Sequence, residues 1–168
     1  ETVRGGSGYV QISEIRLGNV LDAGTLDLAN FALTLNDAMA GLSVAQTVTL
    51  DAAGEQILTG AANLSLNGGI IVDAGTLSST GGLVSASSLS AGGTGVLDFQ
   101  GGTLALPGGA TLVSGASFST SNTTLNLGGS LSVADTWAST NTNISLTDNA
   151  SLSGTVPLSL ASLQTNGH

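Results

Sequence analysis

Cysteine and lysine are absent from the chain, and Arg4 and Arg16 are its only basic residues besides a single histidine. Without cysteine the chain can form neither a disulfide framework nor a thiolate metal site. Its formal net charge of −9 cannot neutralise a run of phosphates, so nucleic acid is excluded as an expected partner. An anionic membrane surface would repel the chain for the same reason.

Charged residues and long apolar runs are also scarce. Only 8% of the residues are charged, against about 25% in an average soluble domain. No apolar run approaches the roughly 18 residues of a membrane-spanning helix, so no membrane insertion is expected. Ser, Thr, Asn and Gly must therefore keep the surface hydrated, and this composition favours a secreted repeat protein over a cytosolic enzyme.

The chain does contain short bursts of strict apolar alternation. They end at Gly, Asn, Asp or Ser, and each has three to five residues. Alternation places one set of side chains inward and the other outward, which is typical of β-strands. The clearest pairs are Leu26/Leu28, Leu33/Leu35, Leu42/Val44, Val48/Leu50, Leu64/Leu66, Leu97/Phe99, Leu104/Leu106, Leu125/Leu127, Leu131/Val133 and Ile144/Leu146.

A spacing of about 20 residues relates these bursts to one another. Three interleaved series of apolar residues recur at intervals of 19–23 residues. They are Leu64, Leu83, Leu104, Leu125 and Ile144; Ile57, Leu77, Leu97, Phe118, Trp137 and Leu158; and Ile70, Leu89, Leu112, Leu131 and Leu152. One period shared by three series predicts a solenoid with three short strands in each coil.

The predicted fold class is all-β: a parallel β-helix, or three-faced β-solenoid, with about 20 residues per coil and roughly seven coils. Residues 21–160 form the solenoid in this interpretation, residues 1–20 an N-terminal cap or linker, and residues 161–168 a C-terminal tail. The alternative is an antiparallel β-sandwich, which predicts strand spacings of about 8–12 residues and no common longer period.

The outward positions beside the Leu64 series form the candidate binding face. On one side they read Asn63, Gly82, Thr103, Thr124 and Asn143, and on the other Ser65, Val84, Ala105, Asn126 and Ser145. The candidate ligand residues among them are Asn63, Thr103, Thr124, Asn143, Ser65, Asn126 and Ser145. A flat, uncharged face of small polar groups suits a glycan or ice, although two adjacent threonines do not make a complete ladder.

Two further motifs bear on binding or modification. The stretch GGTGVLDFQGG (92–102) approaches a calcium-binding nonapeptide repeat, but Asp98 follows Gly95 by three residues instead of two and the motif does not recur in tandem. We therefore predict a plain turn there and no metal site. Four Asn-x-Ser/Thr sequons, at Asn63, Asn122, Asn143 and Asn149, suit surface positions and matter where the source glycosylates secreted proteins.

No arrangement of residues predicts catalysis. The single histidine is His168, so nucleophile–base pairs that use cysteine or an internal histidine are absent. A glycan-cleaving carboxylate pair is the remaining catalytic alternative, and Asp73 and Asp98 are expected at similar coil height but on different faces. We therefore expect no enzyme activity and no cofactor, whereas the alternative predicts that changing Asp73 or Asp98 abolishes cleavage.

The stretches NLSLNGGIIVDAGTLSSTGG and GVLDFQGGTLALPGGATLVSGASF resemble the passengers of bacterial autotransporters and of filamentous-haemagglutinin-type adhesins. The likeness covers roughly residues 20–160 and rests on composition and period. It implies a secreted or cell-surface, right-handed parallel β-helix that serves in adhesion, aggregation or matrix scaffolding. Its expected partners are further copies of itself through exposed coil edges, or a larger parent adhesin, and a glycan is the alternative ligand.

Overall fold

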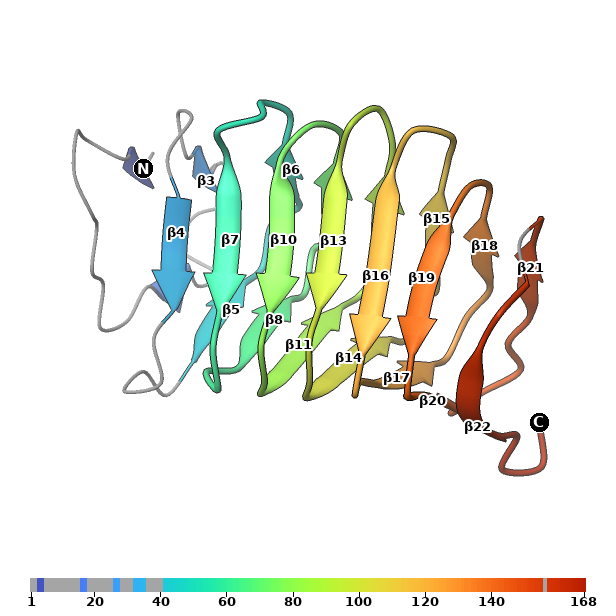
Figure 1. The fold of residues 1–168 in the computed structure, drawn as a ribbon. Helices are drawn as coiled ribbons and strands as arrows, with labels where there is room; N and C mark the ends of the chain where they lie inside the picture. The colour runs from blue at the N-terminus through green and yellow to red at the C-terminus, as the bar shows by residue number, and fades with distance from the viewer. Residues whose placement is uncertain (1–2, 5–15, 18–25, 28–31, 36–40, 156) are drawn as a thin grey trace.

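The computed structural model describes residues 3–4, 16–17, 26–27, 32–35, 41–155 and 157–168. Over these residues the chain is an all-β parallel solenoid with three sheets, about 20 residues per turn and about six turns (Figure 1). The predicted fold class is confirmed, and the antiparallel sandwich is wrong. The number of turns is about six, whereas roughly seven coils were predicted. The prediction counted all of residues 21–160 at about 20 residues per coil, and part of that range lies outside the described residues.

Three sheets form the walls of the solenoid. The eight-stranded sheet contains, in spatial order, β2 (Arg16–Leu17), β5 (Leu42–Val44), β8 (Leu64–Leu66), β11 (Leu83–Ala86), β14 (Thr103–Leu106), β17 (Thr124–Leu127), β20 (Thr142–Leu146) and β22 (Leu160–Gln164). The aromatic sheet contains β4 (Ala32–Leu35), β7 (Gln56–Thr59), β10 (Thr76–Ser79), β13 (Val96–Phe99), β16 (Ser117–Ser121) and β19 (Trp137–Thr140). The short-strand sheet contains β6 (Val48–Leu50), β9 (Ile70–Val72), β12 (Leu89–Ala91), β15 (Ala110–Leu112), β18 (Leu131–Val133) and β21 (Leu152–Gly154).

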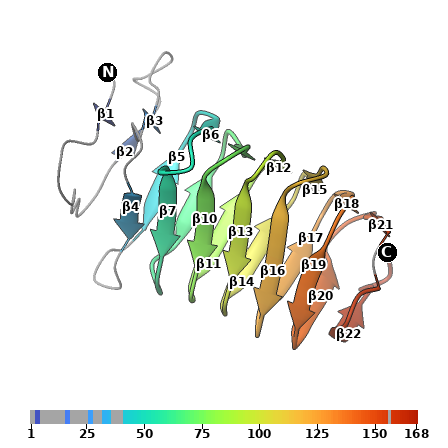
Figure 2. The same cartoon turned by 45° about the horizontal axis from the view of Figure 1, so that its top comes forward.

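The coils turn in a right-handed sense, which is the hand that the family resemblance implies. In Figure 1 the chain advances from the N-terminus on the left to the C-terminus on the right, and the near strands of the aromatic sheet all point down. The chain then crosses below through the eight-stranded sheet and rises on the far side in the short-strand sheet. Figure 2 shows the same stacked coils with their upper turns brought forward.

The core is made of inward side chains stacked in columns along the tube. In β8, for example, Leu64 and Leu66 are fully buried while Ser65 between them is half-buried. One column of the aromatic sheet runs through Ile57, Leu77, Leu97, Phe118 and Trp137, as the sequence series predicted, whereas Leu158, the last member of that series, lies in no strand of this sheet. Each buried aliphatic side chain contributes about 1.5–3 kcal/mol, which the entropy of ordering the chain largely offsets.

The predicted column of the eight-stranded sheet is wrong at one coil. Val84, not Leu83, pairs with Leu64 on one side and Leu104 on the other. Val84 is fully buried, whereas Leu83 is 36% exposed and points outward. The two residues are adjacent and both apolar, so alternation alone did not distinguish the two registers, and a one-residue shift exchanges the inner and outer faces.

A second correction concerns the short-strand sheet. Ala110, not Leu112, pairs with Leu89 and with Leu131. Leu112 is also buried, but it belongs to the neighbouring column with Ala91 and Val133. The first and last residues of a three-residue strand both face inward, so Ala110 and Leu112 are both core residues. The predicted series contained Leu112, the larger of the two, instead of Ala110.

Two corners show why the turns need particular residues. Gly109 has φ +82°, and a Cβ there would lie 2.2 Å from the Ser130 carbonyl oxygen of the next coil. Only glycine allows that backbone conformation and that close approach together. At another corner the Glu55 carboxylate is buried and accepts hydrogen bonds from the backbone N–H of Asp51, at 2.8 Å, and of Ala52, at 3.2 Å.

The predicted domain boundaries at 20 and 160 stay predictions. Most of residues 1–20 lies outside the described residues; β1 (Val3–Arg4) pairs in parallel with β3 (Leu26–Asp27), and β2 pairs with β5. At the other end, β22 pairs with β20, so the eight-stranded sheet extends into the segment predicted as a tail. Across the described ranges there is no helix long and apolar enough to cross a bilayer.

Candidate functional site

The seven candidate ligand residues lie on the outer surface of the eight-stranded sheet. One row runs from Thr103 to Thr124 to Asn143 across β14, β17 and β20. Asn63 stands at the start of this row, where its side chain bonds to the backbone of Leu83 in the next coil. The parallel row runs through Ser65, Ser85, Ala105, Asn126 and Ser145. We call these two rows the polar face.

The register brings residues into the polar face that the sequence analysis missed. Leu83 replaces the expected Gly82 in one row, and Ser85 replaces the expected Val84 in the other. Ser162 extends the first row because it pairs with Asn143. The signal that would have found Ser85 is the spacing from Ser65, which is the same 20 residues that separate Leu64 from Val84.

Hydrogen bonds divide the polar face into a partnered and an open part. The Asn63 Oδ1 accepts a bond from the Leu83 backbone N–H at 3.0 Å, and the Asn143 Oδ1 accepts one from the Ser162 hydroxyl at 2.6 Å. Ser145 accepts one from the Asn166 Nδ2 at 2.9 Å.

The open part of the polar face lies between those partnered positions. The side chains of Ser65, Thr103, Thr124 and Asn126 make no hydrogen bond to any described residue, and all four are half-buried. These hydroxyl and amide groups therefore keep their hydrogen-bonding capacity for water or a ligand.

The polar face also carries no charge. None of the strands β5, β8, β11, β14, β17, β20 and β22 contains an ionisable side chain, whereas β2, at the N-terminal edge of the same sheet, contains Arg16. The described acids lie outside these strands: Asp51, Glu55, Asp73 and Asp135 are at turns between the short-strand and aromatic sheets, Asp98 is on the aromatic sheet, Asp148 is in the turn between β20 and β21, and Asp27 is in β3. A neutral ligand would consequently meet neither charge repulsion nor an ion-pairing group on the two rows of the polar face.

The stretch around Asp98 forms a turn and a strand, with the carboxylate used between coils. Asp98 accepts hydrogen bonds from the hydroxyl of Ser119, at 2.5 Å, and from the Gln100 Nε2, at 2.7 Å. Asp73, the other acid of the catalytic alternative, is exposed at a corner, and its side chain makes no hydrogen bond to any described residue. Within the described ranges no three acids or histidines gather closely enough to hold a metal ion.

Asp135 is the titratable group with the clearest perturbation. Its carboxylate accepts a hydrogen bond from the Gly115 backbone N–H at 2.7 Å and another from the Ser114 hydroxyl at 2.9 Å. Both bonds stabilise the ionised form, so they lower the pKa of Asp135 below its usual value of 3.8, with the Gly115 bond contributing most. The two bonds tie one coil to the next at an exposed turn.

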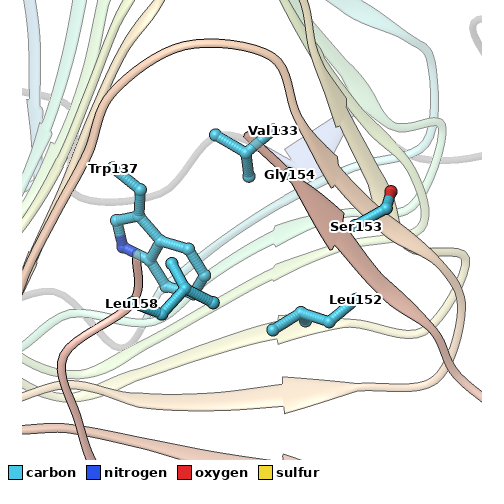
Figure 3. A pocket seen from close by; sticks show the side chains of 6 residues that line it. All are labelled: Val133, Trp137, Leu152, Ser153, Gly154 and Leu158. Carbon is cyan, nitrogen blue, oxygen red and sulfur yellow. The ribbon is translucent and has the colours of Figure 1, made fainter. Parts of the chain in front are cut away.

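A hydrophobic hollow lies at the C-terminal end of the solenoid. It has a volume of about 180 Å³ and is lined by Val133, Trp137, Leu152, Ser153, Gly154 and Leu158 (Figure 3). Gly154 has no side chain at a column position that Val133 and Leu112 fill in the preceding coils. The missing side chain leaves space beside Trp137, and Leu158, which packs against the core, lines the same hollow.

The end coil is also the most exposed part of the core. Leu152 continues the column of Leu131 and is 38% exposed, and Leu163 continues the column of Ile144 and is 56% exposed. β21 and β22 are the outermost strands of their sheets (Figure 1). The column members Leu131 and Ile144, one coil earlier, are fully buried.

A buried polar network supports the aromatic residues near this end, and the sequence analysis did not anticipate it. The Trp137 Nε1 donates to the Thr120 hydroxyl at 2.9 Å, and that hydroxyl lies 2.8 Å from the hydroxyl of Thr142. The Trp137 ring stacks on Phe118 with a centroid distance of 4.9 Å. Thr120, Thr142 and Trp137 are all buried, so the network holds the corner between two sheets.

Comparison with known proteins finds no matching family model, no matching curated protein and no matching solved structure. The structure shows a parallel β-solenoid of about six turns, and the function has to be argued from the surfaces of this chain.

Proposed function

We propose that the chain is a non-catalytic structural module of an extracellular assembly, which joins further coils to the end formed by β21 and β22. The observation that carries this proposal is the uncovered end coil, where Leu152 and Leu163 are 38% and 56% exposed in columns that are buried elsewhere. Covering them with another coil would remove apolar surface from water and extend two sheets by a strand each.

The chemistry of the end strands supports this association. Natural edge strands are usually protected from pairing by lysine, proline or inward-pointing charge. β21 reads LSG and β22 reads LASLQ, so neither strand has any of these features. Each added strand would lengthen the rod by about 4.8 Å, and repeated addition at one end would give a filament.

The surface composition and the likeness to adhesin passengers support an extracellular location. The outer rows are dominated by Ser, Thr, Asn and Gly, and only 8% of the residues are charged. A rigid rod that displays such a surface suits a stalk or matrix component at a bacterial surface, which is the role that the resemblance implies.

The test is negative-stain electron microscopy combined with sedimentation over a range of protein concentrations. Leu152→Lys and Leu163→Lys place a charge on the end coil and are expected to abolish concentration-dependent assembly. Leu83→Lys is the matched control, because Leu83 is 36% exposed on the side of the same solenoid. Assembly that survives both end variants, or a wild-type chain that stays monomeric at every concentration, contradicts the proposal.

A second candidate function is the binding of a neutral glycan or of ice by the polar face. The observation that favours it is the group of polar side chains at its centre that make no hydrogen bond to a described residue, including Thr103, Thr124 and Asn126. Replacing Thr103 and Thr124 by lysine should abolish binding on an array of neutral glycans, or thermal hysteresis at an ice surface, without changing assembly. Thr111→Lys, on the exposed outer row of the short-strand sheet, is the control. Equal binding by the wild type, the Thr103/Thr124 double variant and the Thr111→Lys control would exclude this function.

A further inference from the structure

The four Asn-x-Ser/Thr sequons occupy structurally different positions. An N-linked glycan requires an asparagine amide that a transferase can reach, together with the hydroxyl two residues later, and this combination belongs to exposed loops. In the folded chain a sequon inside a strand is accessible only after local opening, which costs free energy. The described structure therefore ranks the four sites.

The side chains of Asn63 and Asn143 each accept a hydrogen bond from the next coil. Asn63 directly precedes β8, and its Oδ1 accepts the backbone N–H of Leu83 at 3.0 Å. Asn143 lies inside β20 between two neighbouring strands, and its Oδ1 accepts the Ser162 hydroxyl at 2.6 Å. Glycosylation at either position would disturb a bond between coils and place the glycan directly on the sheet surface.

Asn122 lies at a corner of the solenoid, where its side chain makes two hydrogen bonds. It has a positive φ of 52°, its Oδ1 accepts the Asn141 Nδ2 at 2.7 Å, and its own Nδ2 donates to the Ser121 hydroxyl at 3.3 Å. The middle residue of this sequon is Thr123, which is fully buried. The amide nitrogen of Asn122 is therefore already engaged, and the chain after it turns directly into the core.

Asn149 differs from the other three. It lies in the turn between β20 and β21, where Thr147, Asp148 and Asn149 are all exposed. Its backbone N–H donates to the Asp148 Oδ1 at 2.7 Å, but its side-chain amide makes no hydrogen bond to any described residue. The sequon hydroxyl, on Ser151, is also exposed; it donates to the Ser130 hydroxyl at 2.8 Å and keeps its acceptor lone pairs.

We propose that Asn149 is an N-glycosylation site of the folded chain, with a phosphate-activated sugar as the donor. The Asn149 Nδ2 attacks the anomeric carbon, a C–N bond forms as the bond between that carbon and the phosphate oxygen breaks, and the amide loses one proton to a base of the transferase. The lipid pyrophosphate or the nucleoside diphosphate leaves with the bonding electron pair, so no oxidant or reductant is needed. This inference is independent of the assembly proposed above.

The experiment incubates the purified, folded chain with two transferases, one using a lipid-pyrophosphate-linked oligosaccharide and one using a nucleotide-activated hexose. Trypsin cannot separate the sequons, because the chain has no lysine and both arginines precede residue 20. Cleavage before aspartate does separate them, since Asn63, Asn122, Asn143 and Asn149 fall in fragments 51–72, 98–134, 135–147 and 148–168. Mass spectrometry of these fragments then reports the occupied site.

We expect the mass of one hexose or one oligosaccharide on fragment 148–168, at a rate at least about tenfold above that of the other three fragments. Asn149→Gln and Ser151→Ala should abolish the modification, whereas Ser151→Thr and Asn143→Gln should retain it. Which donor works distinguishes the two sources of the sugar. Comparable modification of Asn63, Asn122 or Asn143 in the folded chain, or no transfer to fragment 148–168 from either donor, overturns the proposal.

Discussion

At the scale of single residues, many exposed polar side chains bond to the coil before or after their own. The hydroxyl of Ser151 donates to that of Ser130 at 2.8 Å, and the Asn141 Nδ2 donates to the Asn122 Oδ1 at 2.7 Å. Such bonds recur at intervals close to the coil period, which keeps neighbouring coils in one register. Individually each contributes about 0.5–1.5 kcal/mol or less at the surface.

Asp135 makes one of these contacts pH-dependent. Because the pKa of Asp135 is lowered by the Gly115 N–H and the Ser114 hydroxyl, its contribution to stability is present above the usual value of 3.8. It is lost as the pH falls through the lower pKa of the folded state. We expect Asp135→Asn to lower the urea midpoint at pH 7, and the difference from wild type to disappear on acidification below that folded pKa.

Asp73→Asn is the matched control for this measurement. It removes the same charge from the same series of corners, but its carboxylate makes no hydrogen bond to any described residue. If both variants lower the midpoint equally, the effect does not depend on the two hydrogen bonds at Asp135, and the role assigned to those bonds is wrong.

At the scale of the elements, register decides which side chains form the core. Leu83 and Leu104 belonged to one predicted column, yet Leu104 is fully buried and Leu83 is 36% exposed. The difference arises because β11 places Val84 opposite Leu64 and Leu104. Since strand side chains alternate with period two, neighbouring apolar residues cannot both face inward within one regular strand.

Two leucine-to-alanine variants test this register. Leu104→Ala should lower the free energy of unfolding by about 2–5 kcal/mol, because it leaves a cavity in a packed column. Leu83→Ala should change it by less than about 0.5 kcal/mol, because the side chain is partly solvated on the outer face. Chemical denaturation followed by circular dichroism measures both. A large decrease in the free energy of unfolding for Leu83→Ala would show that Leu83 faces the core, as the sequence series predicted.

At the scale of the whole molecule, net charge opposes the association that the end coil favours. The chain carries −9, while β21 and β22 carry no charge. Repulsion between copies is therefore long-ranged, and apolar contact at the end coil is short-ranged. The polar face contributes nothing to this repulsion.

The balance predicts a salt dependence of assembly. Raising the ionic strength from about 0.01 M to about 0.15 M shortens the screening length from about 30 Å to about 8 Å. Sedimentation at fixed protein concentration should then shift toward larger species, and lowering the pH toward neutralisation of the carboxylates should act in the same direction. Assembly that weakens with salt would indicate ion pairs between copies instead of apolar end contacts.

Much of the fold was predictable because a period is a local property repeated many times. The column through Ile57, Leu77, Leu97, Phe118 and Trp137 follows directly from the spacing, as does the placement of Thr103 beside Thr124. The errors fall where two apolar residues compete within one strand, at Leu83 and Val84 and at Ala110 and Leu112. Local hydrophobicity is equal or misleading at those points, and pairing with neighbouring coils decides.

The sequence by itself determined the fold class, the length of a coil and the absence of charge from one face, because composition and alternation dictate which side chains can be buried. Only the tertiary structure decided which hydroxyl and amide groups are already used between coils and which, such as those of Thr103, Thr124 and Asn149, are open. It also decided that Leu152 and Leu163 are exposed at the end coil while Leu131 and Ile144 are covered. The physical reason is that hydrogen-bond partners and burial depend on residues about 20 positions away, which the register brings together.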